Sequence, residues 1–221
     1  DLISDRMEAM KVLLPDLAAE PELASRFISE IRTLASFDHP NIAQLHTAFQ
    51  YENQLVMIME FVEGYTLDQR AKQPGGIPLD DVLGYTMQVL SAWREAQGNG
   101  VSQRDIKPAN MTVTPHGIVK LMDFGIAKST AEPNMTRPGV TIGSLYYMSP
   151  EQVRGGSIDA RSDLYSVGIS LYELTAGRRP FQADSTYGIL NQQLNVAPQP
   201  PIELNPALPP ALNDVILTAL A

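Results

Sequence analysis

Residues 103–110 bring together side chain types that could handle a proton and a metal ion. Asp105 and Asn110 stand five residues apart, and the cation Lys107 lies between them. The triplet at 123–125, Asp-Phe-Gly, begins thirteen residues after Asn110 and directly follows an apolar segment expected to form a strand. Carboxylate and amide oxygens are ligands that a hard cation such as Mg²⁺ prefers, and glycine lets the adjacent backbone change conformation. Each pattern alone is weak, but their order and spacing together predict a site for proton and metal chemistry.

Composition excludes several other kinds of site. The 221 residues include no cysteine, which removes disulfides, thiolate zinc sites, iron–sulfur clusters and thiol nucleophiles. The 16 lysines and arginines against 25 acidic residues give a net charge of −9, so nucleic acids and anionic membranes are not expected partners. No apolar run reaches the roughly 18 residues of a membrane span, and the first residues lack a signal-peptide pattern.

The elements that must position these residues begin with a small lobe of strands and one helix. Periodicity predicts strands at 9–14, 44–50 and 55–61, and a helix at 21–37. The polar, glycine-bearing residues 64–76 are interpreted as a crossing between lobes. The apolar positions of the helix fall on one stripe, which consists of Leu23, Phe27, Ile31 and Leu34.

A larger and mainly helical lobe is predicted to follow. A helix over 79–97 should end at Gly98, and short strands at 111–113 and 118–121 should form a hairpin. A third helix is expected from about Ser162, with Asp163 as its N-cap. Two segments are predicted to lack helices, namely 123–151, which shows no strong period, and 196–210, which holds six prolines. A last helix should begin near Ala211.

In order and spacing these segments resemble the eukaryotic-type serine/threonine protein kinase family. The motifs are most similar to those of its bacterial members. The resemblance implies an α+β, protein-kinase-like fold of two lobes. It places a partial N-lobe and hinge at 1–62 and a C-lobe at 63–221. The matching motifs are Glu-Ala-Met-Lys at 8–11, Glu30, the segment 102–111, Asp-Phe-Gly at 123–125, Ser-Pro-Glu at 149–151 and the helix at 159–174.

The resemblance also implies catalytic and metal-binding roles. Asp105 would accept or orient the proton of the substrate hydroxyl group, and Lys107 would steady the transferring phosphoryl group. Asn110 and Asp123 would hold Mg²⁺. Since phosphoryl transfer requires little covalent work from a protein, positioning and charge compensation are what such residues supply.

ATP is the second cofactor that the resemblance implies. Lys11 would bind the α- and β-phosphates, and Glu30 would orient Lys11 through an ion pair. Glu30 is expected to share the inward face of its helix with Phe27 and Leu34. The residues expected around the adenine are Ala9, Met59, Glu60, Val62 and Thr112.

Four further residues are expected to be regulatory. Arg104 would bind a phosphate on the activation segment, for which Thr136 and Thr141 are the candidate acceptors. A phosphothreonine adds about −1.5 to −2 charge and can order such a segment against an arginine. Ser144 stands where the family has a threonine that helps to define a preference for hydroxyl substrates.

Some features depart from the family pattern. Gln103 replaces the usual histidine, and Thr112 replaces the apolar residue that normally lies under the adenine. Lys11 comes only eleven residues from the start of the sequence, so we expect a fragment that lacks the glycine-rich phosphate loop and the last C-lobe helices. We expect such a fragment alone to be weakly active or inactive.

The function that the resemblance implies is ATP-dependent phosphorylation of serine and threonine in proteins, including the activation segment of the chain itself. Its expected setting is the cytoplasm, with protein substrates and a homodimer for phosphorylation in trans. One alternative is a pseudokinase, a kinase-shaped nucleotide-binding scaffold, suggested by Gln103 and Thr112. A small-molecule phosphotransferase is disfavoured because residues 123–151 and the Lys107-Pro108 pair are typical of a protein-substrate platform.

Overall fold

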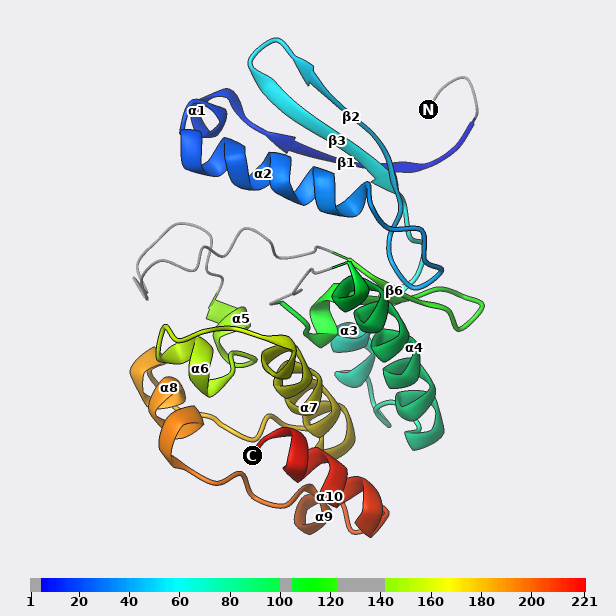
Figure 1. The fold of residues 1–221 in the computed structure, drawn as a ribbon. Helices are drawn as coiled ribbons and strands as arrows, with labels where there is room; N and C mark the ends of the chain where they lie inside the picture. Colours follow the sequence, from blue (N-terminus) through cyan, green and yellow to red (C-terminus); the bar gives the residue numbers. More distant parts are fainter. Residues whose placement is uncertain (1–4, 100–104, 123–141) are drawn as a thin grey trace.

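The computed structural model describes residues 5–99, 105–122 and 142–221. Within these residues a smaller part of strands and helices lies above a larger, mainly helical part (Figure 1). The expected α+β architecture with two lobes is therefore confirmed. The domain boundary at residue 62 stays a prediction.

The smaller part is a three-stranded antiparallel sheet with α2 packed against it. Its strands are β1 (Glu8–Leu13), β2 (Leu45–Tyr51) and β3 (Gln54–Glu60), in the order β1-β3-β2. The four-residue helix α1 (Pro15–Ala18) leads from β1 into α2 (Pro21–Leu34). Phe27 and Leu34 of the predicted stripe are buried, and so is Glu30 on the same face.

The second sheet lies in the larger part, close to the smaller one. It consists of β4 (Tyr65–Thr66), β5 (Met111–Val113) and β6 (Val119–Leu121) in that order, and α3 (Leu67–Ala71) follows β4 directly. The segment 64–76, expected only as a crossing, therefore holds a strand and a helix. Thr66 and Gln69 form a capping box at the start of α3, a four-residue signal that the sequence already contains.

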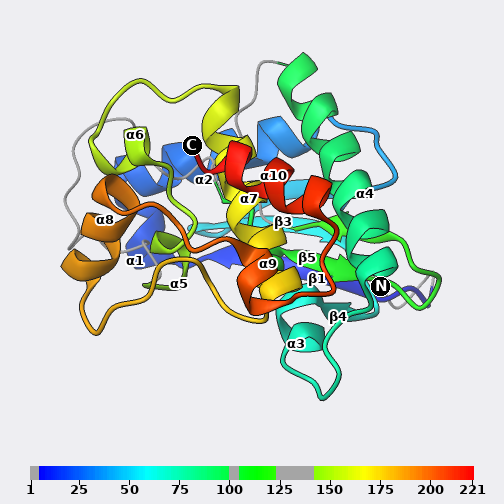
Figure 2. The same cartoon turned by 90° about the horizontal axis from the view of Figure 1, so that it is seen from below.

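Helices form the rest of the larger part. The long α4 (Leu79–Gly98) lies beside α7 (Ala160–Ala176), and the last helix, α10 (Pro210–Ala219), lies across α7 (Figure 2). None of the helices in the described part of the chain is both long and apolar enough to cross a membrane. The shorter elements are the 3-10 turn η1 (Pro108–Asn110), α5 (Ile142–Leu145), α6 (Pro150–Val153), α8 (Thr186–Asn195) and α9 (Pro201–Leu204).

Three predictions about helices in this part are wrong. The N-cap of α7 is Asp159, whereas Asp163 lies fully buried in the first turn and accepts a hydrogen bond from Gln97 Nε2 at 3.0 Å. The proline-rich tract contains α9, because Pro201 occupies the first helical position, where no N–H is needed. The described end of the 123–151 segment contains α5 and the start of α6, rather than loop alone.

The segment between α2 and β2 ties the two parts together. Asn41 Nδ2 donates to Gln88 Oε1 on α4 at 2.9 Å and to the Val119 carbonyl on β6 at 2.8 Å. The Leu121 amide donates to the Asn41 carbonyl, and the Ala43 amide donates to the Leu121 carbonyl. Backbone of the smaller part thus runs beside β6, which fixes one lobe relative to the other.

Replacing Gly168 with alanine is expected to destabilise the packing of α10 on α7. A Cβ atom at Gly168 would lie 2.8 Å from Ala219 Cβ and 3.2 Å from Leu220 Cδ2. Such overpacking should lower the free energy of unfolding by about 1–3 kcal/mol, measured by urea denaturation. The control is Gly84→Ala on the exposed face of α4, where nothing lies within 4 Å of the new atom. Alanine there should be neutral or stabilising, and equal destabilisation by both changes would contradict the proposed contact.

Candidate functional site

An ion pair joins the first strand to α2. Lys11 and Met57 are paired in the β1–β3 register, and Met57 is wholly buried. Lys11 Nζ lies 2.6 Å from Glu30 Oε1, with 40% of the lysine side chain exposed and only 7% of the glutamate side chain. The carboxylate is thus removed from water and compensated by the amine. The lysine side chain stays partly exposed while the carboxylate is buried.

Two side chains at the turn η1 donate to one carboxylate, that of Asp105. Asn110 Nδ2 donates to Asp105 Oδ2 and to the Asp105 carbonyl, each at 3.0 Å. Lys107 Nζ donates to the same Oδ2 at 2.9 Å. Because the Asn110 nitrogen is used in this way, Oδ1 is the atom of that amide that could bind a cation. Three residues that the sequence predicted as catalytic or metal-binding are therefore adjacent.

Lys107 also connects this turn to α5. Its Nζ donates to Ser144 Oγ at 2.7 Å, and Ser144 is almost fully buried. The two residues are 37 positions apart in the sequence. Ser144, expected to be regulatory, thus lies within one hydrogen bond of the lysine that contacts Asp105.

The β5–β6 hairpin brings the residue before Asp123 to the same place. The Met122 amide donates to the Asn110 carbonyl at 2.8 Å, so the chain leaves β6 beside the turn. No group of three His, Cys, Asp or Glu side chains that could hold a metal occurs among the residues that the structure describes. The predicted site residues outside those ranges are Arg104, Asp123, Thr136 and Thr141, and Gln103 lies there as well.

The residues expected around an adenine come from both sheets and from the segment between them. Ala9 pairs with Met59 across β1 and β3, and Met59 is buried. Thr112 is also buried, and it pairs in register with Thr66 and Lys120 in the second sheet. Val62 is partly buried and packs against the hydrophobic core.

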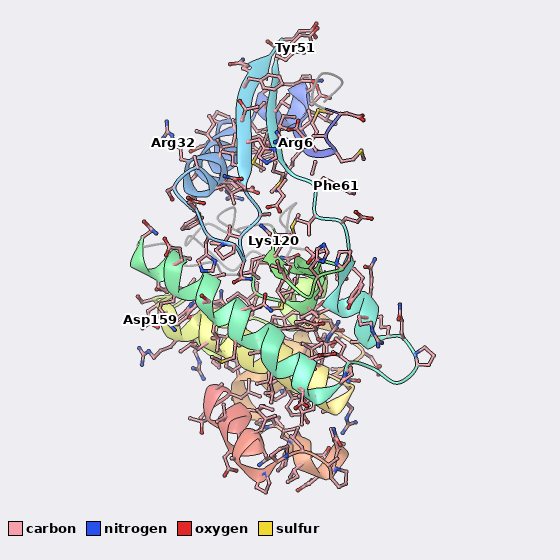
Figure 3. The ribbon with its side chains drawn as sticks, turned by 90° about the vertical axis from the view of Figure 1, so that its right-hand side faces the viewer. Arg6, Arg32, Tyr51, Phe61, Lys120 and Asp159 are labelled. Carbon is pink, nitrogen blue, oxygen red and sulfur yellow. The ribbon has the colours of Figure 1, made fainter. Side chains whose placement is uncertain are left out.

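The Glu60 side chain has a role that the sequence did not indicate. Lys120 Nζ, on β6, donates to Glu60 Oε2 at 2.9 Å, and the Gln44 amide donates to the same oxygen at 3.1 Å. Figure 3 places Lys120 at the junction of the two parts, with Phe61 above it. The pair joins residues 60 positions apart, so no local pattern could have revealed it. It holds the end of β3 against the second sheet.

The Glu151 carboxylate joins two helices of the larger part. Ser162 Oγ donates to Glu151 Oε1. Burial alone would raise the pKa of the Glu151 carboxyl group, but hydrogen bonds from Ser162 and the backbone hold this pKa below its ordinary value. The carboxylate is therefore an anchor between the start of α6 and the start of α7.

Comparison with known proteins gives the same picture over nearly the whole chain. Residues 3–217 match the family described as protein kinase domain. The chain is 37% identical over 219 residues to a probable serine/threonine-protein kinase PknB of Lactococcus lactis, an alignment that covers 99% of the chain and 35% of that relative.

Two further relatives agree. The serine/threonine-protein kinase PrkC of Bacillus subtilis is 36% identical over 221 residues, covering 100% of the chain and 34% of the relative. The serine/threonine-protein kinase PknB of Mycobacterium leprae is 36% identical over 226 residues, covering 100% of the chain and 36% of the relative. The chain thus spans about a third of the length of these curated relatives.

Proposed function

This chain belongs to the protein kinase domain family, and we propose that it transfers the γ-phosphoryl group of ATP to serine and threonine hydroxyl groups of proteins, including its own activation segment. The observation that supports this most is the convergence of Lys107 and Asn110 on one oxygen of Asp105. Lys107 in turn contacts Ser144. The arrangement suits the transfer of a proton from a hydroxyl group next to a transferring phosphoryl group.

Kinases of this family use ATP and a divalent metal ion, and the residue types at the proposed site suit both. The Lys11 side chain is partly exposed and Glu30 holds its amine in place, which suits the α- and β-phosphates. Asn110 would offer Oδ1 to Mg²⁺, and Asp123 would offer a carboxylate oxygen. A bound metal ion would supply positive charge that offsets the negative charge of the phosphates.

The chain's own residues would carry out the remaining steps. Asp105 would take the proton from the substrate hydroxyl group while the hydroxyl oxygen bonds to the γ-phosphorus. The bond from that phosphorus to the β-phosphate oxygen would break, and ADP would leave. Lys107 would stabilise the negative charge on the transferring group and keep Asp105 oriented. Asn110 would hold the same oxygen of the Asp105 carboxylate, which would keep the proton acceptor next to a proposed metal ligand.

The adenine and the activation segment complete the proposal. The Glu60 carbonyl and the Val62 amide would meet the adenine edge, with Ala9, Met59 and Thr112 around the ring. We propose that Arg104 binds a phosphate on Thr136 or Thr141, and that a second copy of the protein delivers it in a transient homodimer. The cytoplasm is the proposed setting because that compartment supplies ATP.

Incubation of the full-length protein with γ-labelled ATP and Mg²⁺ tests this function. We expect label on serine or threonine of the protein itself or of a generic protein substrate. Chelation of the metal ion should abolish it, because uncompensated phosphate charge opposes the transfer. Asp123→Ala is the matched control. Labelling no higher than that of this variant would contradict the proposal, and nucleotide-dependent thermal stabilisation without transfer would favour a scaffold instead.

A further inference from the structure

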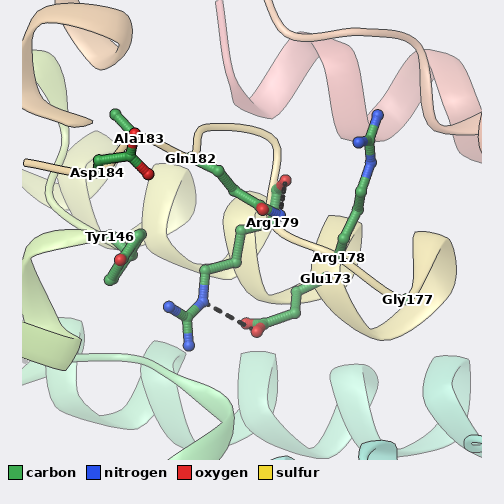
Figure 4. Close-up of a pocket in the computed structure, with 8 residues that line it drawn as sticks. All are labelled: Tyr146, Glu173, Gly177, Arg178, Arg179, Gln182, Ala183 and Asp184. Carbon is green, nitrogen blue, oxygen red and sulfur yellow. Dashed lines mark hydrogen bonds and ion pairs between the residues drawn. The ribbon is translucent and has the colours of Figure 1, made fainter. Parts of the chain in front are cut away.

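A cavity of about 440 Å³ opens between the end of α7, residues 177–184 and Tyr146 (Figure 4). Its lining carries two arginines, Arg178 and Arg179, and two carboxylates, Glu173 and Asp184. Opposite charges therefore balance in the lining, and the removal of either arginine would leave it with a net negative charge.

The cavity is connected to the proposed catalytic turn by a short, anchored segment. Tyr146 comes two residues after Ser144, which accepts the hydrogen bond from Lys107. The Leu145 carbonyl accepts a bond from Gln193 Nε2 at 2.9 Å, and the Tyr147 carbonyl accepts one from Ser166 Oγ at 2.7 Å. One end of this segment contacts the proposed catalytic lysine and the other lines the cavity. A polypeptide whose hydroxyl group reaches Asp105 would pass near the cavity.

Both oxygens of Glu173 already have partners. Arg179 Nε donates to Glu173 Oε1 at 3.0 Å, and the Tyr147 hydroxyl group donates to Oε2. Burial and the charge of Glu173 raise the pKa of the Tyr147 phenol, which therefore stays protonated as a donor. Only 17% of the Glu173 side chain is exposed. With both oxygens engaged and the side chain largely buried, the carboxylate offers little access to a further cation.

Arg179 is itself held in position by two aromatic rings. Its guanidinium carbon lies 4.1 Å from the centroid of the Tyr146 ring and 5.5 Å from that of Tyr147. Both distances fall within the usual range of cation–π contacts. A guanidinium group has five N–H donors, and Nε uses one of them on Glu173. Arg178 extends toward Gln199 instead, to whose Oε1 it donates at 2.6 Å.

We propose that this cavity is a subsite for one side chain of the protein substrate, and that Arg179 makes the subsite reject lysine and arginine. The side chain accepted is one with an acceptor oxygen, a carboxylate or an amide, which can bind the guanidinium group. A basic side chain would place a second cation beside Arg179 without access to Glu173. The inference rests on the proposed function and adds the substrate class to it.

Position-scanned serine peptides test the subsite. Each position around the serine is varied among Arg, Gln and Glu, and kcat/KM is measured with the full-length protein. At one position we expect the arginine peptide to react about tenfold more slowly than the glutamine or glutamate peptide. In Arg179→Ala, Glu173 becomes available to the substrate. The kcat/KM of the arginine peptide should then rise about tenfold relative to that of the glutamine peptide.

Three further variants separate this effect from a general loss of charge or of structure. Arg161→Ala removes an arginine whose partner, Asp159, is exposed and lies outside the cavity, so the peptide ranking should not change. Arg178→Ala removes the same charge from the lining but leaves Glu173 paired with Arg179. It should change the ratio of kcat/KM between the arginine and glutamine peptides less than Arg179→Ala does. If Arg179→Ala does not fold, Glu173→Gln should deepen the rejection of arginine, because only the cation then remains.

Two outcomes would overturn the inference in distinguishable ways. If the ratio of arginine to glutamine peptide rates is the same in the wild type, in Arg179→Ala and in Glu173→Gln, transfer itself stands but Arg179 does not set specificity. If no peptide is phosphorylated and the protein does not label itself, the proposed function fails, and the subsite fails with it.

Discussion

Replacing Asp105 with asparagine is expected to lower the rate of phosphoryl transfer by about 10²–10⁴-fold, the usual contribution of a positioned general base. Asparagine has nearly the same shape but no basic carboxylate. It would also present an amide to Lys107 and Asn110, two groups that donate to Oδ2 in the native site. The rate is measured with saturating ATP and Mg²⁺, and the KM for ATP should change little, since Asp105 is not proposed to bind the nucleotide.

A matched control for this change is Asp80→Asn, which removes a carboxylate from the exposed first turn of α4. This control should keep the wild-type rate. Thermal unfolding of both variants shows whether the fold is retained. A folded Asp105→Asn protein that transfers phosphate within threefold of the wild-type rate would exclude Asp105 as the proton acceptor.

Replacing Lys11 with methionine should reduce kcat/KM for ATP by about 10²–10³-fold, comparable to removing one charged donor from a preorganised site. Methionine keeps much of the side chain volume but cannot bind phosphate. The loss should extend to kcat, because the charge on the phosphates grows as the bond to the leaving oxygen breaks. Lys11→Arg should also be impaired, since a planar guanidinium group does not replace a compact ammonium group at a site built for the latter.

A double-mutant cycle with Glu30→Gln tests whether Glu30 acts through Lys11. The two groups lie 2.6 Å apart, and the carboxylate is nearly buried. If Glu30 only positions the amine, the double variant should be no slower than Lys11→Met alone. Strictly additive losses would instead mean that the two residues contribute independently, and the proposed role of Glu30 would have to be given up.

Local pattern was sufficient for most of the long elements. The stripe that includes Phe27 and Leu34 predicted α2, and Gly98 marked the end of α4, because helix periodicity and helix ends are short-range properties. The prediction of no helix in the proline tract was wrong because the effect of a proline depends on its position. Pro201 begins a helix, whereas a proline within a helix interrupts it. The capping box of Thr66 and Gln69 is a local signal that could have predicted α3.

The candidate site also contains both contacts that are local in the sequence and contacts that are not. The spacing of Asp105, Lys107 and Asn110 is short, so the turn that joins them could be anticipated from the order of residues alone. The contacts of Lys107 with Ser144 and of Lys120 with Glu60 span 37 and 60 positions. Such contacts depend on how helices and sheets pack, and no local periodicity encodes them.

The amino-acid sequence by itself determined the family, the α+β class and the kinds of side chain available for phosphoryl transfer. These follow from residue identity, order and short-range spacing. Only the tertiary structure decided that Arg179 pairs with Glu173 and lies over the Tyr146 ring, and that Lys120 pairs with Glu60 at the junction of the lobes. The physical reason is that a charged side chain takes its partner from whatever packing brings within hydrogen-bonding distance, and that distance is set by the whole fold.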